Sequence, residues 1–178
     1  ILWGFYLIKM PQKEYFGLNS ITNLNKILSK HKPKGIFLVT GKNSYEKSGA
    51  KSVLDKILKG YNITRFYNFD VNPKLKDIQK GIKSFKNNKC DFVVTIGGGS
   101  VMDVAKSINS FAANEGNPED YLQKGKIIKK KGKMLVAVPT TAGSGSEATK
   151  FAVIYINKTK YSLDNEFILP DYSIVDPQ

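Results

Sequence analysis

The 178-residue chain is poor in the residues that build reactive centres, with one cysteine, Cys90, one histidine, His31, and one arginine, Arg65. A lone cysteine cannot form a disulfide within the chain, which agrees with a reducing compartment. We expect His31 to be exposed beside Lys32 and Pro33. Neither a histidine metal centre nor a Ser-His-Asp triad can be built with it. The sequence therefore predicts no metal ligand and no catalytic residue in the chain itself.

Long apolar runs are also absent. No run approaches the roughly 20 residues needed to cross a bilayer. Residues 1–12 lack the basic start and the small-residue cleavage site of a secretory signal peptide. These features predict a cytoplasmic protein without a membrane partner.

Acidic side chains are scarce, with 15 Asp and Glu against 28 Lys and Arg and a formal net charge of +13. Nearly all of the basic residues are lysines spread along the chain, whereas recognition of bases and phosphates favours the guanidinium fork of arginine. The densest run, 124–133, indicates first a solvated linker and only second a binding patch. We predict no nucleic-acid partner.

Short β-rich apolar runs alternate with segments of helical period. The pattern predicts strands at 35–40, 63–69, 90–96 and 134–139 and helices at 48–58, 76–87 and 100–113. Continuous apolar runs are typical of a parallel sheet that helices cover on both faces. We predict a Rossmann-like open α/β domain, in which Cys90 is a small core residue.

The pattern changes after Ser146. Further strands are predicted at 151–156 and 172–175, joined through residues 157–160 and a loop that contains Pro170. They predict a small β-hairpin extension of the sheet domain. The chain stops directly after the last predicted strand, and we expect it to be a fragment.

Two glycine-rich turns follow predicted strands, TIGGGSVMDVAK at 95–106 and VPTTAGSGSEAT at 138–149. Ligands of open parallel sheets bind outside the carboxyl ends of the strands. The strict dinucleotide fingerprint fails, because Met102 stands where its third glycine belongs. Glycines before a helix still let backbone amides approach an anion. The turns therefore indicate a nucleotide crevice, with a tight turn and a serine/threonine capping loop as the alternatives.

The helix after the glycines has an expected cap and an expected core face. Ser100 is a good N-cap residue, and Asp103 stands where a capping box places its carboxylate. The residues with core-facing period are Val101, Val104, Ala105, Ile108 and Phe111.

The segments GGGSVMDVAK (97–106), VPTTAGSGSEAT (138–149) and ILPDYSIVDPQ (168–178) together resemble the iron-dependent, group III alcohol dehydrogenase family. The resemblance covers nearly the whole chain in order. It implies that residues 1–178 form an NAD(P)-binding α/β domain, with the family's helical C-terminal domain missing from this chain. It also implies interconversion of a small-molecule alcohol and an aldehyde or ketone, a divalent metal (Fe or Zn) held by the missing domain, and a homodimer when full length.

The resemblance assigns cofactor-binding positions residue by residue. These are Gly97, Gly98, Gly99 and Ser100 in the pyrophosphate loop, Thr140, Thr141 and Ser144 in a second loop near the nicotinamide, and Val153 and Lys160 beside the nicotinamide ribose. Asn72 matches a further position, although Val71 replaces the family's usual proline before it. Asp103 matches an aspartate that is either a helix cap or a wall of the site.

One departure from the family pattern concerns the choice of cofactor. NAD-using members often carry an aspartate after the first long strand, where this chain has Gly41, followed by Lys42, Asn43 and Ser44. A carboxylate would bond a ribose 2′-hydroxyl and repel a 2′-phosphate, whereas glycine with lysine and serine would accept one. We predict binding of NADPH in preference to NADH, with Gly41, Lys42 and Ser44 at the site.

Two other functions fit the same residues. The dehydroquinate synthases share the architecture and use NAD in a lyase reaction, although their second loop continues differently after residues 142–147. A nucleotide-binding module without catalysis is the second alternative. Segment 160–167 also resembles members that reduce phosphonoacetaldehyde, and a basic chain suits an anionic substrate.

Overall fold

The computed structural model describes residues 12–178. Its strands are β1 (Lys13–Phe16), β2 (Ile36–Thr40), β3 (Ile63–Phe66), β4 (Phe92–Gly97), β5 (Met134–Pro139), β6 (Phe151–Ile156), β7 (Thr159–Asp164) and β8 (Tyr172–Val175). Its α-helices are α1 (Asn23–His31), α2 (Ser44–Lys47), α3 (Ala50–Ile57), α4 (Leu75–Asn87), α5 (Gly99–Ala113) and α6 (Pro118–Gln123). Single 3₁₀ turns occur at Ser20–Thr22, Ser146–Ala148 and Glu166–Ile168.

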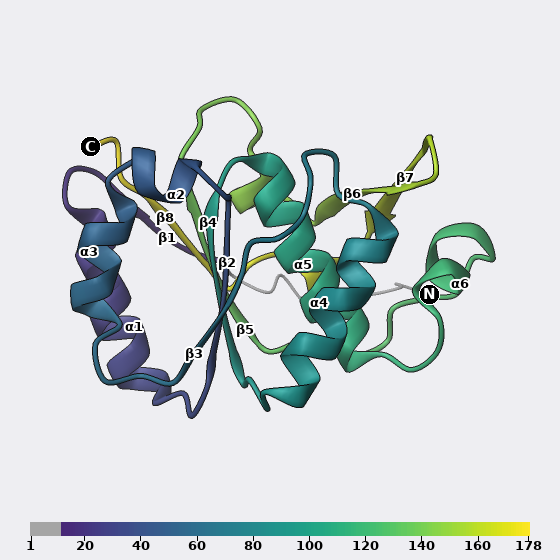
Figure 1. Cartoon of the computed structure of the whole chain (residues 1–178), viewed down its shortest axis with the longest axis horizontal. Coiled ribbons are helices and arrows are strands. Elements are labelled where there is room, and N and C mark those ends of the chain that lie inside the picture. Colours follow the sequence, from purple (N-terminus) through teal and green to yellow (C-terminus); the bar gives the residue numbers. More distant parts are fainter. Residues whose placement is uncertain (1–11) are drawn as a thin grey trace, which may run out of the picture.

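Six of the strands form one parallel sheet in the order β1-β8-β5-β4-β2-β3 (Figure 1). Strands β6 and β7 pair with each other as an antiparallel hairpin. This arrangement confirms the predicted open α/β fold with flanking helices and a hairpin extension. No helix within residues 12–178 has the length and apolar character to span a membrane.

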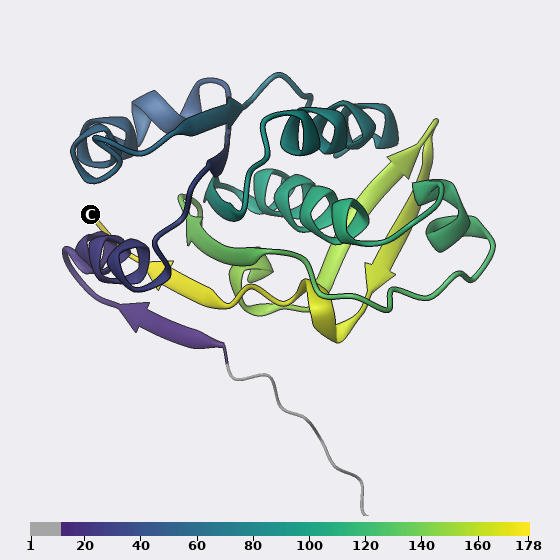
Figure 2. The same cartoon turned by 90° about the horizontal axis from the view of Figure 1, so that it is seen from below.

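Helices cover both faces of the sheet, as Figures 1 and 2 show. Alternate residues of β2 point to opposite faces. Ile36 and Leu38 pack in one apolar cluster with α1 and α3. Phe37 and Val39 pack in the other, with α4, α5 and the hairpin. Burial on both faces is the reason that the central strands read as continuous apolar runs.

Helix α5 lies at the centre of the second cluster. All five residues of its predicted core face are buried. Helix α4 approaches it closely at Gly81, where an added Cβ would lie 2.2 Å from Cδ1 of Ile108. A glycine in α4 therefore sets the distance between the two helices.

Several elements differ from those predicted from the sequence. The predicted helix 48–58 corresponds to α3, which begins only at Ala50, after Gly49 with a φ of +75°. The short helix α2 before it was not predicted. The sequence predicted only residues 157–160 and a loop between the strands at 151–156 and 172–175, but a further strand, β7, lies there. The apolar pattern did not predict β7, because Leu163 is the only buried residue of this strand.

The sequence predicted the burial of two individual residues, Cys90 and His31. The prediction for Cys90 is confirmed, because its side chain is buried. The prediction that His31 is exposed is wrong. Its ring is half-buried, lies 2.9 Å through Nε2 from the hydroxyl of Tyr172, and packs on the ring of Phe92. The carboxyl-terminal end of α1, which the sequence did not predict as a helix, carries it there.

The lysine-rich segment 124–133 is a connection without regular structure, as predicted, but its backbone is held in place. Oδ1 of Asn114 accepts hydrogen bonds from the amides of Lys129 and Lys130, each 3.0 Å long. Oδ1 of Asn109 accepts a hydrogen bond from the amide of Lys133, and Nδ2 of Asn109 donates one to the carbonyl of Lys133. Two buried asparagines, Asn109 in α5 and Asn114 directly after it, therefore fix the path of the chain into β5.

Candidate nucleotide-binding site

The site predicted from the sequence lies where the sheet reverses its direction of winding. Strand β2 leads through α2 and α3 to β3 on one side, whereas its other neighbour, β4, leads through α5 to β5. The carboxyl ends of β2 and β4 are adjacent, with Thr40 opposite Ile96. Such a point is the usual ligand crevice of an open α/β sheet.

The glycine loop joins β4 directly to α5. An added Cβ on Gly97 would lie between 2.6 and 3.0 Å from three side-chain atoms of Val101, so a larger residue cannot occupy this position without displacing α5. The helix begins at Gly99, with Gly98 as its N-cap residue and no side-chain cap. Backbone amides of a first helical turn lack partners within the helix and favour an anion.

Of the alternatives left open for Ser100 and Asp103, the capping role is wrong, because no side chain caps the helix. The helix begins one residue earlier than predicted, because Gly99 already has helical conformation, and Ser100 lies inside the first turn. Asp103 instead accepts hydrogen bonds from Oγ of Ser146 at 2.8 Å and from the amide of Val153 at 3.1 Å. Asp103 therefore joins α5 to the second loop and to the hairpin.

The second loop packs directly on the glycine loop. The amide of Thr140 donates to the carbonyl of Gly97 at 3.0 Å. An added Cβ on Gly98 would lie 3.0 Å from Oγ1 of Thr141, and one on Gly99 would lie 2.9 Å from Cβ of Ser144. The structure thus brings Thr140, Thr141 and Ser144 against the start of α5, so the two loops form one surface.

The hydroxyl of Thr140 is buried and has no hydrogen-bond partner among residues 12–178. Leaving a buried hydroxyl unpaired costs about 1–3 kcal/mol. A polar ligand between the two loops would remove this cost. Thr141 and Ser144 are exposed beside it and present further hydroxyls.

Sequence reasoning missed Lys106, one turn after Asp103. Its side chain is 1% exposed, and Nζ donates to the carbonyls of Ser146 at 2.8 Å and Thr149 at 3.0 Å. Burial lowers the pKa of Lys106 to about 8, against the opposing charges of Asp103 and Glu147. Lys106 falls outside the predicted core-facing stripe of the helix, so helical periodicity did not predict its burial.

Burial also raises the pKa of Asp103 above its ordinary value. The hydrogen bonds from Ser146 and Val153 oppose this shift, as do the charges of Lys106 and Lys160. The half-buried Asp103 and the buried Lys106 each bond segment 146–153 and hold it on α5. We call these two residues the α5 latch.

The hairpin brings the remaining predicted residues to the same side of the sheet. Val153 in β6 bonds the α5 latch through its amide, and the exposed Lys160 in β7 lies opposite Tyr155 of β6. The amide of Tyr155 donates to the carbonyl of Pro73 at 2.7 Å, directly after Asn72, whose φ is +62°. Val153 and Lys160 therefore lie on the hairpin, and Asn72 lies beside its contact with Pro73.

The turn after β2 lies beside the glycine loop. An added Cβ on Gly41 would lie 2.0 Å from Oγ of Ser44 and 3.7 Å from a methyl of Val101, the residue that also faces Gly97. Gly41 and the glycine loop are thus neighbours. Lys42 and Ser44 are both exposed at this turn.

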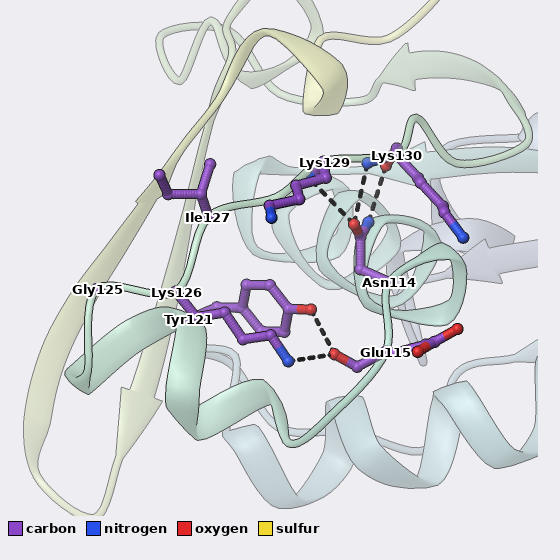
Figure 3. Close-up of a pocket in the computed structure, with 8 residues that line it drawn as sticks. All are labelled: Asn114, Glu115, Tyr121, Gly125, Lys126, Ile127, Lys129 and Lys130. Carbon is purple, nitrogen blue, oxygen red and sulfur yellow. Dashed lines mark hydrogen bonds between the residues drawn. The ribbon is translucent and has the colours of Figure 1, made fainter.

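A cavity of about 460 Å³ lies elsewhere, between α6 and the segment that leads into the amino end of β5 (Figure 3). Its lining residues are Asn114, Glu115, Tyr121, Gly125, Lys126, Ile127, Lys129 and Lys130. None of them is a predicted site residue. The hydroxyl of Tyr121 and Nζ of Lys126 both donate to the carbonyl of Glu115, so these groups hold the segment in place.

A metal site cannot be assembled from the described residues. Within residues 12–178, no three or more His, Cys, Asp or Glu side chains lie close enough together to hold a metal ion. The donor set required by Fe or Zn is therefore not met by this part of the chain.

Comparison with known proteins decides the family. The model of the family described as iron-containing alcohol dehydrogenase matches residues 11–177. The chain belongs to this family. It is 34% identical over 177 residues to the long-chain primary alcohol dehydrogenase of Thermoanaerobacter ethanolicus, a match that covers 96% of this chain and 44% of the relative.

Solved structures of the family have the same fold. The NADH-dependent butanol dehydrogenase A of Thermotoga maritima matches with a TM-score of 0.87 and 27% identity, over 94% of this chain and 43% of that one. The sulfoacetaldehyde reductase of Bifidobacterium kashiwanohense, solved with NAD⁺, matches with a TM-score of 0.86 and 30% identity, over 94% and 45%. The chain therefore spans less than half the length of these relatives.

The buried lysine of the α5 latch predicts a pH dependence of stability. Between pH 8 and 10.5, the unfolded chain holds a proton that folded Lys106 has lost, so the free energy of unfolding rises with pH. Measured by urea unfolding, the free energy of unfolding of the parent protein should rise with pH more steeply than that of Lys106→Met, by as much as about 1.4 kcal/mol per pH unit. Lys56→Met removes an exposed lysine of α3 and should retain the parent slope. Equal slopes for the parent protein and Lys106→Met would contradict the role given to burial.

Proposed function

We propose that this chain is the cofactor-binding part of an NAD(P)-dependent alcohol dehydrogenase or aldehyde reductase, which transfers hydride between NADPH and an alcohol or aldehyde. The supporting observation is the contact of two loops at the start of α5, with the buried, unpaired hydroxyl of Thr140 between them. Membership of the iron-containing alcohol dehydrogenase family supports the dehydrogenase over the synthase-like lyase.

The described residues fit a dinucleotide. The amides of residues 97–100 would hold the pyrophosphate at the start of α5. Thr140, Thr141 and Ser144 would bond the nicotinamide end, and Val153 and Lys160 would border its ribose, with Asn72 nearby. The bound cofactor supplies or accepts the hydride. The α5 latch holds the second loop against α5.

In this proposal the metal of the family is not bound by this chain. Since no ligand cluster exists in residues 12–178, we assign the Fe or Zn to a helical domain beyond this chain, and no chemical step here passes through it. The substrate pocket would then lie between two domains. A small aldehyde or alcohol, such as the anionic phosphonoacetaldehyde, is the substrate class, and the complete enzyme would be a cytoplasmic homodimer.

Crowding the contact between the loops should weaken cofactor binding without unfolding the protein. In Gly99→Ala, the new methyl group would press on Ser144, which is exposed and can move away. We expect the dissociation constant of the dinucleotide to rise about tenfold, or about 1.4 kcal/mol, in isothermal titration. The control Gly35→Ala meets its nearest atoms at 3.5 Å, an ordinary contact, and should bind like the parent. Unchanged affinity in Gly99→Ala would place the cofactor elsewhere.

The turn after β2 predicts which cofactor binds better. Gly41 carries no carboxylate to repel a 2′-phosphate, and Lys42 beside it is exposed and positive. We expect NADPH to bind more tightly than NADH in titration calorimetry. Gly41→Asp should weaken NADPH by about tenfold and leave NADH nearly unchanged, whereas the uncharged isostere Gly41→Asn should have a smaller effect. A parent protein that binds NADH at least about tenfold more tightly would contradict the preference.

The last expectation separates the dehydrogenase from a binding module without catalysis. Residues 1–178 expressed alone should bind NADPH weakly and reduce no aldehyde, because residues 12–178 hold no cluster of metal ligands. The complete protein with iron or zinc should oxidise NADPH when aldehydes are screened, as followed by absorbance. Metal-dependent turnover by residues 1–178 would refute the division of roles. Binding without turnover in the complete protein would favour the module.

A further inference from the structure

The only arginine of the chain is held rigidly at the carboxyl end of β3. Nε of Arg65 donates to Oγ1 of Thr40 at 2.9 Å. The guanidinium carbon lies 4.5 Å from the ring centre of Tyr45 and 4.6 Å from that of Tyr67. Stacking on aromatic rings restricts a guanidinium, whose fork of donors is already planar. Arg65 thus presents a fixed group, unlike the flexible lysines around it.

The charge of Arg65 has no partner in the described part of the chain. No carboxylate of residues 12–178 lies within ion-pair distance of it, although seven lysine–carboxylate contacts occur in the same region. Its only hydrogen bond to these residues uses Nε. The two terminal NH₂ groups therefore keep donors for a ligand, and a guanidinium that is half-buried without an anion is an unusual use of a single arginine.

Arg65 lies beside the turn that the cofactor proposal assigns to the adenosine ribose. Thr40, which it bonds, is the last residue of β2 and directly precedes Gly41. Tyr45, which it stacks on, directly follows Ser44 in α2. The guanidinium is therefore tied to both ends of the Gly41–Ser44 turn. Lys42 within the turn is exposed and has no side-chain hydrogen bond to the described residues, so it offers charge without fixed geometry.

We propose that Arg65 is the specificity-determining residue for the 2′-phosphate of NADP(H), which it binds through its free NH₂ groups. Two parallel hydrogen bonds from a planar fork suit a phosphate, and they need no rearrangement here because Thr40 and the two tyrosines already hold the fork. Lys42 adds attraction to the same group. This inference rests on the proposed function, since it names the group that reads the cofactor.

The test compares two small probes that differ by the 2′-phosphate. Adenosine 2′,5′-bisphosphate and adenosine 5′-monophosphate would be titrated by calorimetry into the complete protein and its variants. In Arg65→Gln, we expect the affinity for the bisphosphate to fall at least about tenfold and that for the monophosphate to change less than about twofold. Arg65→Lys keeps the charge but loses the fork, and it should fall between the parent and Arg65→Gln.

The control Lys56→Gln removes one positive charge from an exposed site on α3 and should bind both probes like the parent. Equal weakening of both probes in Arg65→Gln would show that Arg65 only supports the fold of the turn, and no weakening would show that it does not contact the phosphate. Either result overturns the inference and leaves the proposed function standing. If the parent protein binds both probes equally well, both this inference and the preference for NADPH are wrong. If it binds neither probe, the proposed dinucleotide site is wrong.

Discussion

The candidate site depends on the buried contact between α5 and the segment after β5. Asp103 and Lys106 stand one turn apart on the helix and bond Ser146, Thr149 and Val153. Burying two ionisable groups is expensive unless they are paired and hydrogen-bonded. Here each charge meets several partners on the segment that it holds. Losing either residue would remove some of the hydrogen bonds that hold this segment on α5.

The parallel sheet decides where this contact is made. Neighbouring parallel strands end on the same edge, so the turns after β2, β4 and β5 meet although they are far apart in the sequence. Glycine is needed where these turns touch, since added side-chain atoms at Gly97 or Gly99 would collide with Val101 or Ser144. Packing alone therefore favours glycine at these positions, whether or not a ligand binds there.

Sequence patterns were sufficient where one local property governs the structure. The apolar runs of β2, β4 and β5 and the period of α5 are local, and each was predicted to within two residues. They were insufficient where neighbours in space supply the stability. Strand β1 has no buried residue and forms because it pairs with β8, and β7 forms because it pairs with β6. The capping role predicted for Asp103 failed for a related reason, since local spacing does not reveal a partner 43 or 50 residues away.

The sequence by itself determined the fold class, the family resemblance and the positions of the two glycine-rich turns, because each of these is encoded in a short contiguous pattern. Only the tertiary structure revealed that the turns touch, that Lys106 is buried, and that Arg65 is fixed between two tyrosines without an anion. The physical reason is that burial and pairing are properties of surroundings assembled from distant segments. The identity of a lysine or an arginine in the sequence does not show whether its side chain is exposed, buried or placed to bind a ligand.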